Sequence, residues 1–334
     1  MKALKVILKG LLWVIGLILV FFLLMFIYHK ISNKIYEDKY YKVPGDLIEV
    51  YDNEFMHAKL IGSGEYTIVM LSGMGTPSPY YDFYNLIESL SKNNKVLIIE
   101  QLGYGYSSET EKNRTLENYT NEIDKVLNHF NITDNIVMLS HSYMGPITLN
   151  YSNNHDSVKG YVCLDCSSAY QVEKNVLDNE EFPKYPKYYS LMSPSGLTRL
   201  IGLIGGEELL NELYLSDIRE EHKKDYEYFI YNRTLNKTII KEMEDFPKIE
   251  KEMLNKKYKD NLYVITYLAS DTIASMDEYY KEGDFLYSWN EMHEKLISND
   301  EIQKIYVLNG DHYIHHGNTE VITNGINNMI NTIE

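Results

Sequence analysis

The chain has 334 residues, of which 44% are hydrophobic and 24% are charged, so it can bury a large core. Its formal net charge of −16 argues against nucleic acid as a partner, because phosphate binding needs a basic surface. The same charge argues against adhesion of the globular part to anionic lipid. The length fits one α/β domain that carries an insertion.

The first thirty residues have the composition of a membrane-spanning helix. Residues 11–28 carry no charge, and as a helix they would be roughly 27 Å long, against a hydrocarbon core of roughly 30 Å. The small residues of a signal-peptide cleavage site are missing from residues 26–30. We therefore predict an uncleaved transmembrane signal anchor over residues 1–30 and a polar, tyrosine-rich connector over 31–46. Lysines flank the anchor in almost equal numbers, so charge bias does not determine its orientation. The segment ahead of the anchor is short, as in export anchors, and this favours an extracytoplasmic globular domain.

Beyond the connector, two antiparallel strands are expected at residues 47–51 and 57–61, and an alternation of strands and helices follows them. Further strands are expected at 66–71, 96–100, 136–139, 158–164, 262–268 and 305–308, and helices at 80–91, 116–130, 143–152, 276–297 and 321–333. Strands that are apolar throughout and alternate with amphipathic helices predict a sheet covered on both faces. The expected fold class is α/β, with a doubly wound, mostly parallel sheet.

The alternation stops in the middle of the chain. Residues 170–259 are polar, rich in Glu, Lys and Tyr, and show helix-like pieces without a buried-strand pattern. We expect this segment to be a helical lid inserted into one core domain, whose two parts are residues 47–169 and 260–334.

One motif carries the chemistry. The segment 140–145, Ser-His-Ser-Tyr-Met-Gly, directly follows the apolar run at 136–139 and precedes a helix-compatible stretch. Strand, sharp turn and helix form the context in which Ser142 is held on a strained elbow with its hydroxyl exposed. A serine alone is a poor nucleophile, so a base, an acid and an oxyanion pocket must lie elsewhere.

Suitable groups follow the other predicted strands. They are the glycine-rich loop 72–75, the turn 100–107, Asp271 and His312. With the segment 140–145, these markers resemble the α/β-hydrolase fold family from about residue 47 to the C-terminus, in the family's order of Ser, Asp and His.

The resemblance implies a role for each marker. Ser142 would be the nucleophile, His312 the base and Asp271 the acid, while the backbone N–H groups of Met74 and Tyr143 would form the oxyanion hole. Gly103 and Gly105 are expected to form a turn rather than to contact a ligand.

Competing residues remain for two of these roles. His315 and His316 lie within four residues of His312, and we expect them to be loop or supporting residues. Asp165 competes with Asp271, because some members of the fold place the acid at the end of that earlier strand. Asp277 is a weaker rival.

The chain also departs from the family pattern. Met144 replaces the second small residue of the elbow, and Ser72 replaces the usual histidine of the oxyanion loop. Small residues belong in the elbow because strand and helix approach closely there. Gly145, one residue later, is expected to keep enough room, but Met144 is the best argument for a degenerate site.

We expect a membrane-anchored serine hydrolase that cleaves a small-molecule ester or acyl substrate through an acyl-enzyme. Nothing in the sequence requires a metal or an organic cofactor. The alternatives are an acyltransferase, a prolyl-type aminopeptidase and a non-catalytic surface binding protein. An aminopeptidase would need lid carboxylates to hold the substrate's amino group, and the candidates are Glu180, Glu181, Glu207 and Glu208.

Overall fold

The computed structural model describes residues 2–171, 184–210, 216–282 and 287–333. Its centre is an eight-stranded sheet with the strand order β1-β2-β4-β3-β5-β6-β7-β8. The strands are β1 (Asp46–Tyr51), β2 (Glu54–Gly62), β3 (Thr67–Leu71), β4 (Lys95–Glu100), β5 (Ile136–His141), β6 (Val158–Leu164), β7 (Tyr263–Ala269) and β8 (Gln303–Leu308). β2 runs antiparallel to both β1 and β4, and all other neighbours are parallel. The predicted doubly wound, mostly parallel sheet is confirmed.

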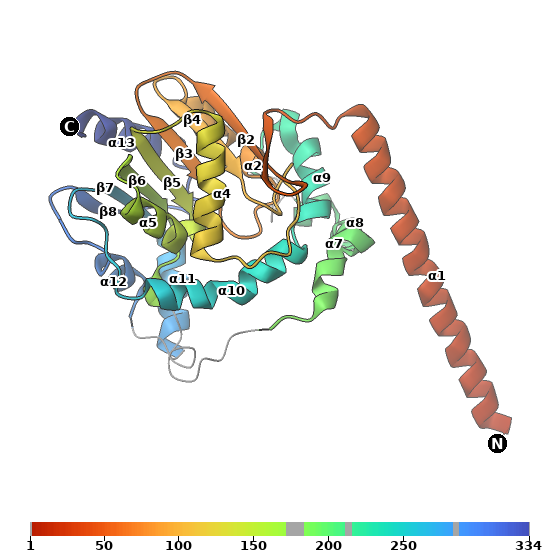
Figure 1. Cartoon of the computed structure of the whole chain (residues 1–334). Helices are drawn as coiled ribbons and strands as arrows, with labels where there is room; N and C mark the ends of the chain where they lie inside the picture. The colour runs from red at the N-terminus through yellow and green to blue at the C-terminus, as the bar shows by residue number, and fades with distance from the viewer. Residues whose placement is uncertain (1, 172–183, 211–215, 283–286, 334) are drawn as a thin grey trace.

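Helices cover both faces of this sheet (Figure 1). On one face lie α4 (Leu116–His129) and α5 (Gly145–Asn154), and on the other lie α2 (Pro79–Asp82), α3 (Tyr84–Leu90) and α13 (Thr319–Thr332). Side chains that alternate along β3 enter two separate buried clusters, with Val69 in the first and Ile68 in the second. The central strands consist mostly of apolar residues because both of their faces are buried.

The inserted segment leaves the sheet after β6 and returns to it at β7. Its described residues form three short 3₁₀ turns and four α-helices, and none of them is in a strand. The turns are η2 (Ala169–Gln171), η3 (Lys187–Leu191) and η5 (Glu220–His222), and the helices are α7 (Met192–Ser195), α8 (Leu197–Leu210), α9 (Lys223–Arg233) and α10 (Lys237–Met253). Beyond β7, α11 (Ser270–Glu282) and α12 (Trp289–Glu294) overlap the region 276–297, which was expected to be largely helical.

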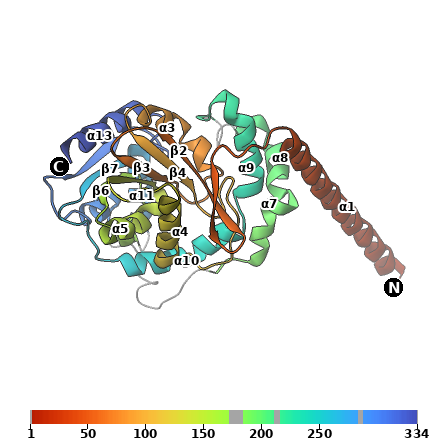
Figure 2. The same cartoon turned by 45° about the horizontal axis from the view of Figure 1, so that its top comes forward.

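The N-terminal helix α1 (Lys2–Lys39) is long and apolar enough to cross a membrane. It extends away from the domain, and α7, α8 and α9 lie between it and the sheet (Figure 2). The first part of the predicted connector over 31–46 is helical, because α1 continues to Lys39. The reason is tertiary packing: His29, Asn33 and Tyr36 are spaced by about one turn each and are all buried.

Candidate active site

Ser142 occupies a strained turn between β5 and α5. Its φ of 52° lies in the left-handed region, which residues other than glycine adopt at a cost. The turn is fixed by its neighbours: the Ser167 N–H donates to the Ser142 carbonyl at 2.8 Å. A Cβ on Gly145 would lie 2.2 Å from the Ser167 carbonyl oxygen, so only glycine fits there. Gly145 thus provides the close approach that the elbow needs.

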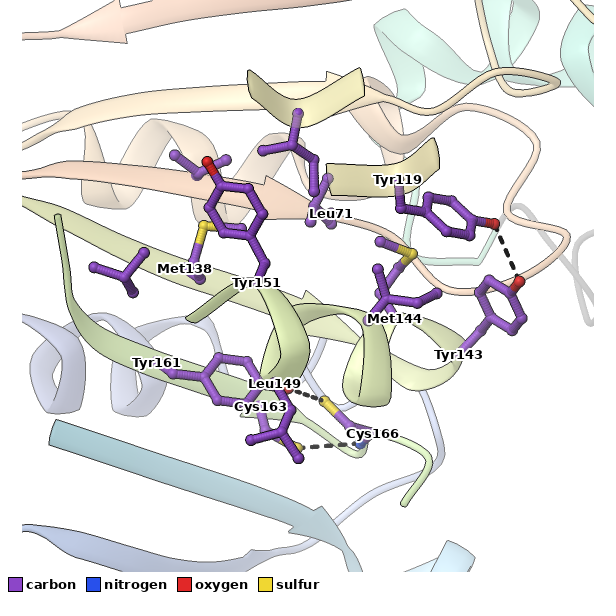
Figure 3. Close-up of a cluster of buried hydrophobic side chains, with 14 of the residues drawn as sticks. Leu71, Tyr119, Met138, Tyr143, Met144, Leu149, Tyr151, Tyr161, Cys163 and Cys166 are labelled. Atoms are coloured by element: carbon purple, nitrogen blue, oxygen red, sulfur yellow. Dashed lines mark hydrogen bonds between the residues drawn. The ribbon is translucent and has the colours of Figure 1, made fainter. Parts of the chain in front are cut away.

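Met144 is fully buried in the core beneath the elbow. Figure 3 shows its side chain in the cluster that also contains Leu71 and Tyr119. Tyr143 lies beside it, with its hydroxyl 3.1 Å from the Tyr119 hydroxyl. The departure from a small residue at position 144 is therefore absorbed by core packing, and Ser142 keeps its strained conformation.

Ser142, His312 and Asp165 form a continuous hydrogen-bonded chain. The His312 Nε2 lies 2.8 Å from the Ser142 Oγ, and its Nδ1 lies 2.7 Å from the Asp165 Oδ2. The Asp165 carboxylate is fully buried, and its other oxygen accepts from the Ala269 N–H at 3.0 Å and from the Trp289 indole at 3.4 Å. With Nδ1–H donated to the carboxylate, the Nε2 lone pair faces the serine hydroxyl. This is the arrangement that lets an imidazole act as a base.

The structure corrects the expectation for Asp271. This residue lies in the first turn of α11, is exposed, and accepts from the Ser270 hydroxyl at 3.0 Å. β7 passes directly into that helix, and the His312 Nδ1 contacts Asp165 instead of Asp271. Asp165 instead follows β6, the strand next to β5, and leaves it with a φ of 44° that turns the chain toward His312.

The glycine-rich loop lies directly against Ser142. A Cβ on Gly73 would lie 2.7 Å from the Ser142 Cβ and 2.8 Å from the His141 Nδ1, so no side chain fits at this position. Met74 follows Gly73 in this loop, and Tyr143 follows Ser142 at the start of η1 (Ser142–Met144). Met74 and Tyr143, the predicted oxyanion residues, are thus the chain neighbours of Gly73 and Ser142, which lie against each other. The turn 100–107 behaves as expected, since Gly103 and Gly105 both have positive φ.

His141 is a supporting residue that sequence reasoning missed. It is buried inside the elbow motif, and its Nε2 lies 2.9 Å from the backbone carbonyl of His312. Burial, together with the nearby His312, lowers the pKa of His141 well below its usual range. The ring is therefore neutral, and because its Nε2 faces a carbonyl oxygen, that nitrogen carries the proton. His141 thus links β5, which directly precedes Ser142, to the loop that carries His312. Its only signal in the sequence is its position next to Ser142.

His315 and His316 fix the same loop through a buried carboxylate. Their Nε2 atoms lie 3.0 and 3.1 Å from the two oxygens of the buried Asp82. Burial opposes ionisation of Asp82, but the two imidazoles prevail and lower the pKa of its carboxyl. The donor atoms of these three residues lie within 4.8 Å of one another, close enough to hold a metal ion. Both carboxylate oxygens already accept hydrogen bonds, so we assign the three residues to fixing the loop.

A buried carboxylate links the inserted segment to the elbow. Glu242 of α10 accepts hydrogen bonds from the hydroxyls of Tyr104 and Tyr119, and Tyr119 in turn contacts Tyr143. Burial, partly offset by the nearby Arg114 and the two tyrosine hydroxyls, raises the pKa of Glu242 to about 7. Of the lid carboxylates named for an aminopeptidase, Glu180 and Glu181 lie outside the described residues, and so do the side chains of Glu207 and Glu208.

The raised pKa predicts a pH-dependent stability that Glu242→Gln removes. Between the ordinary pKa of 4.5 and about 7, the folded state binds more protons at this site than the unfolded state. The stabilisation is therefore present at low pH and is lost as pH rises to about 7, by at most about 1.4 kcal/mol per pH unit. Urea unfolding of both proteins in detergent at pH 5, 6 and 7 measures this slope. Exposed Glu252 on the same helix provides the control, Glu252→Gln, and parallel profiles for Glu242→Gln and the parent would contradict the prediction.

Comparisons with known proteins agree with this architecture. The family model described as "alpha/beta hydrolase fold" matches residues 66–329. An uncharacterised Bacillus subtilis protein, YbdG, is 25% identical over 245 residues, which cover 72% of each chain.

Solved structures show the same fold at low identity. The Cif epoxide hydrolase from Acinetobacter nosocomialis has a TM-score of 0.63 at 16% identity, covering 91% of this chain and 96% of that one. The Vigna radiata epoxide hydrolase VrEH1 has a TM-score of 0.60 at 16% identity, covering 86% of this chain and 98% of that one. A loop variant of the Bradyrhizobium elkanii haloalkane dehalogenase DbeA has a TM-score of 0.57 at 13% identity, covering 86% of this chain and 96% of that one. The family implies a hydrolase that acts on a small molecule, and the chain belongs to the alpha/beta hydrolase fold family.

Proposed function

We propose that this protein is a serine hydrolase that cleaves carboxylic esters through an acyl-enzyme. The observation that carries the proposal is the hydrogen-bonded chain from Ser142 through His312 to Asp165. Ser142 is the nucleophile, His312 is the general base and acid, and Asp165 orients the imidazole and stabilises its cation.

The reaction proceeds in two steps. The His312 Nε2 takes the hydroxyl proton while the Ser142 Oγ bonds to the ester carbonyl carbon, whose oxygen becomes negative. The backbone N–H groups of Met74 and Tyr143 donate to that oxygen, and each such donor typically contributes a factor of about 10² to 10³ in rate. The imidazolium then protonates the departing alcohol, and the acyl group remains on Ser142. Water, deprotonated by His312, attacks the acyl-enzyme and releases the carboxylic acid.

The serine itself favours acyl chemistry over the reactions named for the structural neighbours. An epoxide or a haloalkane presents a saturated carbon to the nucleophile. Attack by the Ser142 oxygen on such a carbon would form an ether, which has no carbonyl for water to attack, and the enzyme would stop after one turnover. Attack on an ester carbonyl leaves an acyl group that water removes, so the site can turn over.

The first test is labelling with a fluorophosphonate, which reacts with activated serines. The full chain in detergent is expected to be labelled at Ser142, as located by mass spectrometry of the modified peptide, and to hydrolyse p-nitrophenyl esters. Heat-denatured protein is the control, because labelling must depend on the folded site. A folded protein that resists the probe would contradict the hydrolase proposal and favour an anchored binding protein.

We also propose that α1 anchors the protein in a membrane, with the catalytic domain on the extracytoplasmic side. Side chains over most of the apolar stretch are exposed, as expected for a helix that lies in lipid. Its last turns pack against the lid through His29, Asn33 and Tyr36. Cleavage between the apolar stretch and the domain would break those contacts, so an anchor fits better than a removable signal.

A further inference from the structure

Helix α8 of the lid exposes an apolar face to solvent. Ile201, Leu203 and Ile204 are 46%, 53% and 78% exposed, and residues 197–206 form a short apolar helix. Exposed apolar side chains that occur singly need no explanation, but three within four residues mark a contact surface.

The start of α8 lies against the end of the membrane-spanning stretch of α1. A Cβ on Gly196 would lie 2.7 Å from the His29 Cβ and 3.5 Å from the Met25 carbonyl oxygen. The Arg199 guanidinium donates to the Asn33 side chain at 2.8 Å. The uncharged stretch ends at Tyr28, so at roughly 1.5 Å per residue α8 begins within about one helical turn of the bilayer surface. Figures 1 and 2 both show α8 beside α1.

The neighbouring side chains are those of a membrane–water interface. Tyr36 of α1 stacks on Tyr228 of α9, with ring centroids 4.3 Å apart. Lys224 of α9 lies 3.3 Å from the ring centre of Tyr40, and Arg199 lies 4.2 Å from that of Tyr231. Tyrosines and long cationic side chains gather at this depth because they keep an apolar body in lipid and a polar end in water. Tyr36 and Tyr231 are buried between α1 and the lid, whereas Tyr40 and Lys224 are exposed beside them, so this edge of the lid carries side chains suited to an interface.

We propose that the exposed face of α8 rests in the bilayer that holds α1, so that the lid itself contacts lipid. The inference depends on the proposed membrane anchor and is independent of the proposed chemistry. A second copy of the chain is a poorer occupant for this face, because molecules with a net charge of −16 repel one another. α8 also begins beside Met25 and His29, at the end of the apolar stretch of α1.

The test is a depth measurement on the full chain in phosphatidylcholine vesicles. A nitrobenzoxadiazole fluorophore is attached to Ile204→Cys, and its quenching by spin labels on lipid acyl chains is recorded. Cys163 and Cys166 are 1% and 2% exposed, and labelling of the parent protein checks that they stay unmodified. The control is Val321→Cys on α13, an apolar position that is 51% exposed and far from α1. A second probe at Leu19→Cys reports on the anchor.

The probe at position 204 is expected to emit at shorter wavelength than the probe at 321 and to be quenched severalfold more strongly. Water-like emission without quenching at 204, beside a quenched probe at 19, would overturn the proposal and leave the anchor intact. Short-wavelength emission without lipid quenching would mean that protein covers the face, and would also overturn it. If the probe at 19 stays unquenched, the anchor and this proposal fail together. Catalysis plays no part in the readout, so the hydrolase proposal is tested separately.

Discussion

Replacing Ser142 with alanine is expected to lower kcat for p-nitrophenyl esters by on the order of 10⁶-fold, and to abolish fluorophosphonate labelling. The Ser142 Oγ is the atom that His312 contacts at 2.8 Å, and no other described hydroxyl bonds to the Nε2 of His312. Without it the acyl-enzyme cannot form, and only the weak effect of binding and oxyanion stabilisation remains. The measurement is the steady-state rate beside the labelling assay, on the full chain in detergent.

Ser140 offers a matched control within the same motif. It is buried, with its hydroxyl 2.8 Å from that of Tyr161, and so it lies in the core behind the elbow. Ser140→Ala is expected to cost about 1 kcal/mol of stability, because a buried hydrogen bond is lost, and to keep labelling and kcat within a few-fold of the parent. Equal rates for Ser142→Ala and the parent would show that the activity belongs to another site or to a contaminant.

The positions of the proposed nucleophile and the proposed base were predictable because each has a local signature. Ser142 follows an apolar strand and precedes a helix, and His312 follows the last strand. The acid has no such signature, since Asp165 and Asp271 both follow buried strands. The choice between them depends on how the chain leaves the strand, through a positive φ at Asp165 or directly into a helix at Asp271. Residue types do not determine that direction at an aspartate. The expected contact of Asp271 with His312 is therefore not found, and Asp165, the open alternative, makes it.

The length of α1 likewise could not be predicted from local sequence. The strands were predictable from runs of apolar residues, which are buried whatever their partners. Residues 31–39 are polar, and nothing local to them indicates helix rather than connector. Their conformation depends on distant contacts, such as the hydrogen bond from Asn33 to Asn232 at 2.7 Å and the stacking of Tyr36 on Tyr228. Contacts between segments almost two hundred residues apart are not visible in a sequence pattern.

Asp165→Asn is expected to lower kcat by about 10⁴-fold with little change in the fold. The asparagine amide can donate a hydrogen bond to the His312 Nδ1, which would move the ring proton to Nε2. Nε2 would then face Ser142 as a donor and could not take its proton. The size of asparagine preserves the packing beside Trp289, so fluorescence and unfolding in urea should change little beyond the loss of one charge.

Asp271→Asn is the matched variant, with the same chemical change on an exposed side chain. It is expected to leave kcat within a few-fold of the parent, because its carboxylate bonds to Ser270 and not to His312. Comparing the two variants therefore separates the two candidates without reference to any other protein. A large loss for Asp271→Asn with an active Asp165→Asn would require the loop that carries His312 to move during catalysis and bring Asp271 to the imidazole. A similar small effect in both would mean that His312 works without a carboxylate partner.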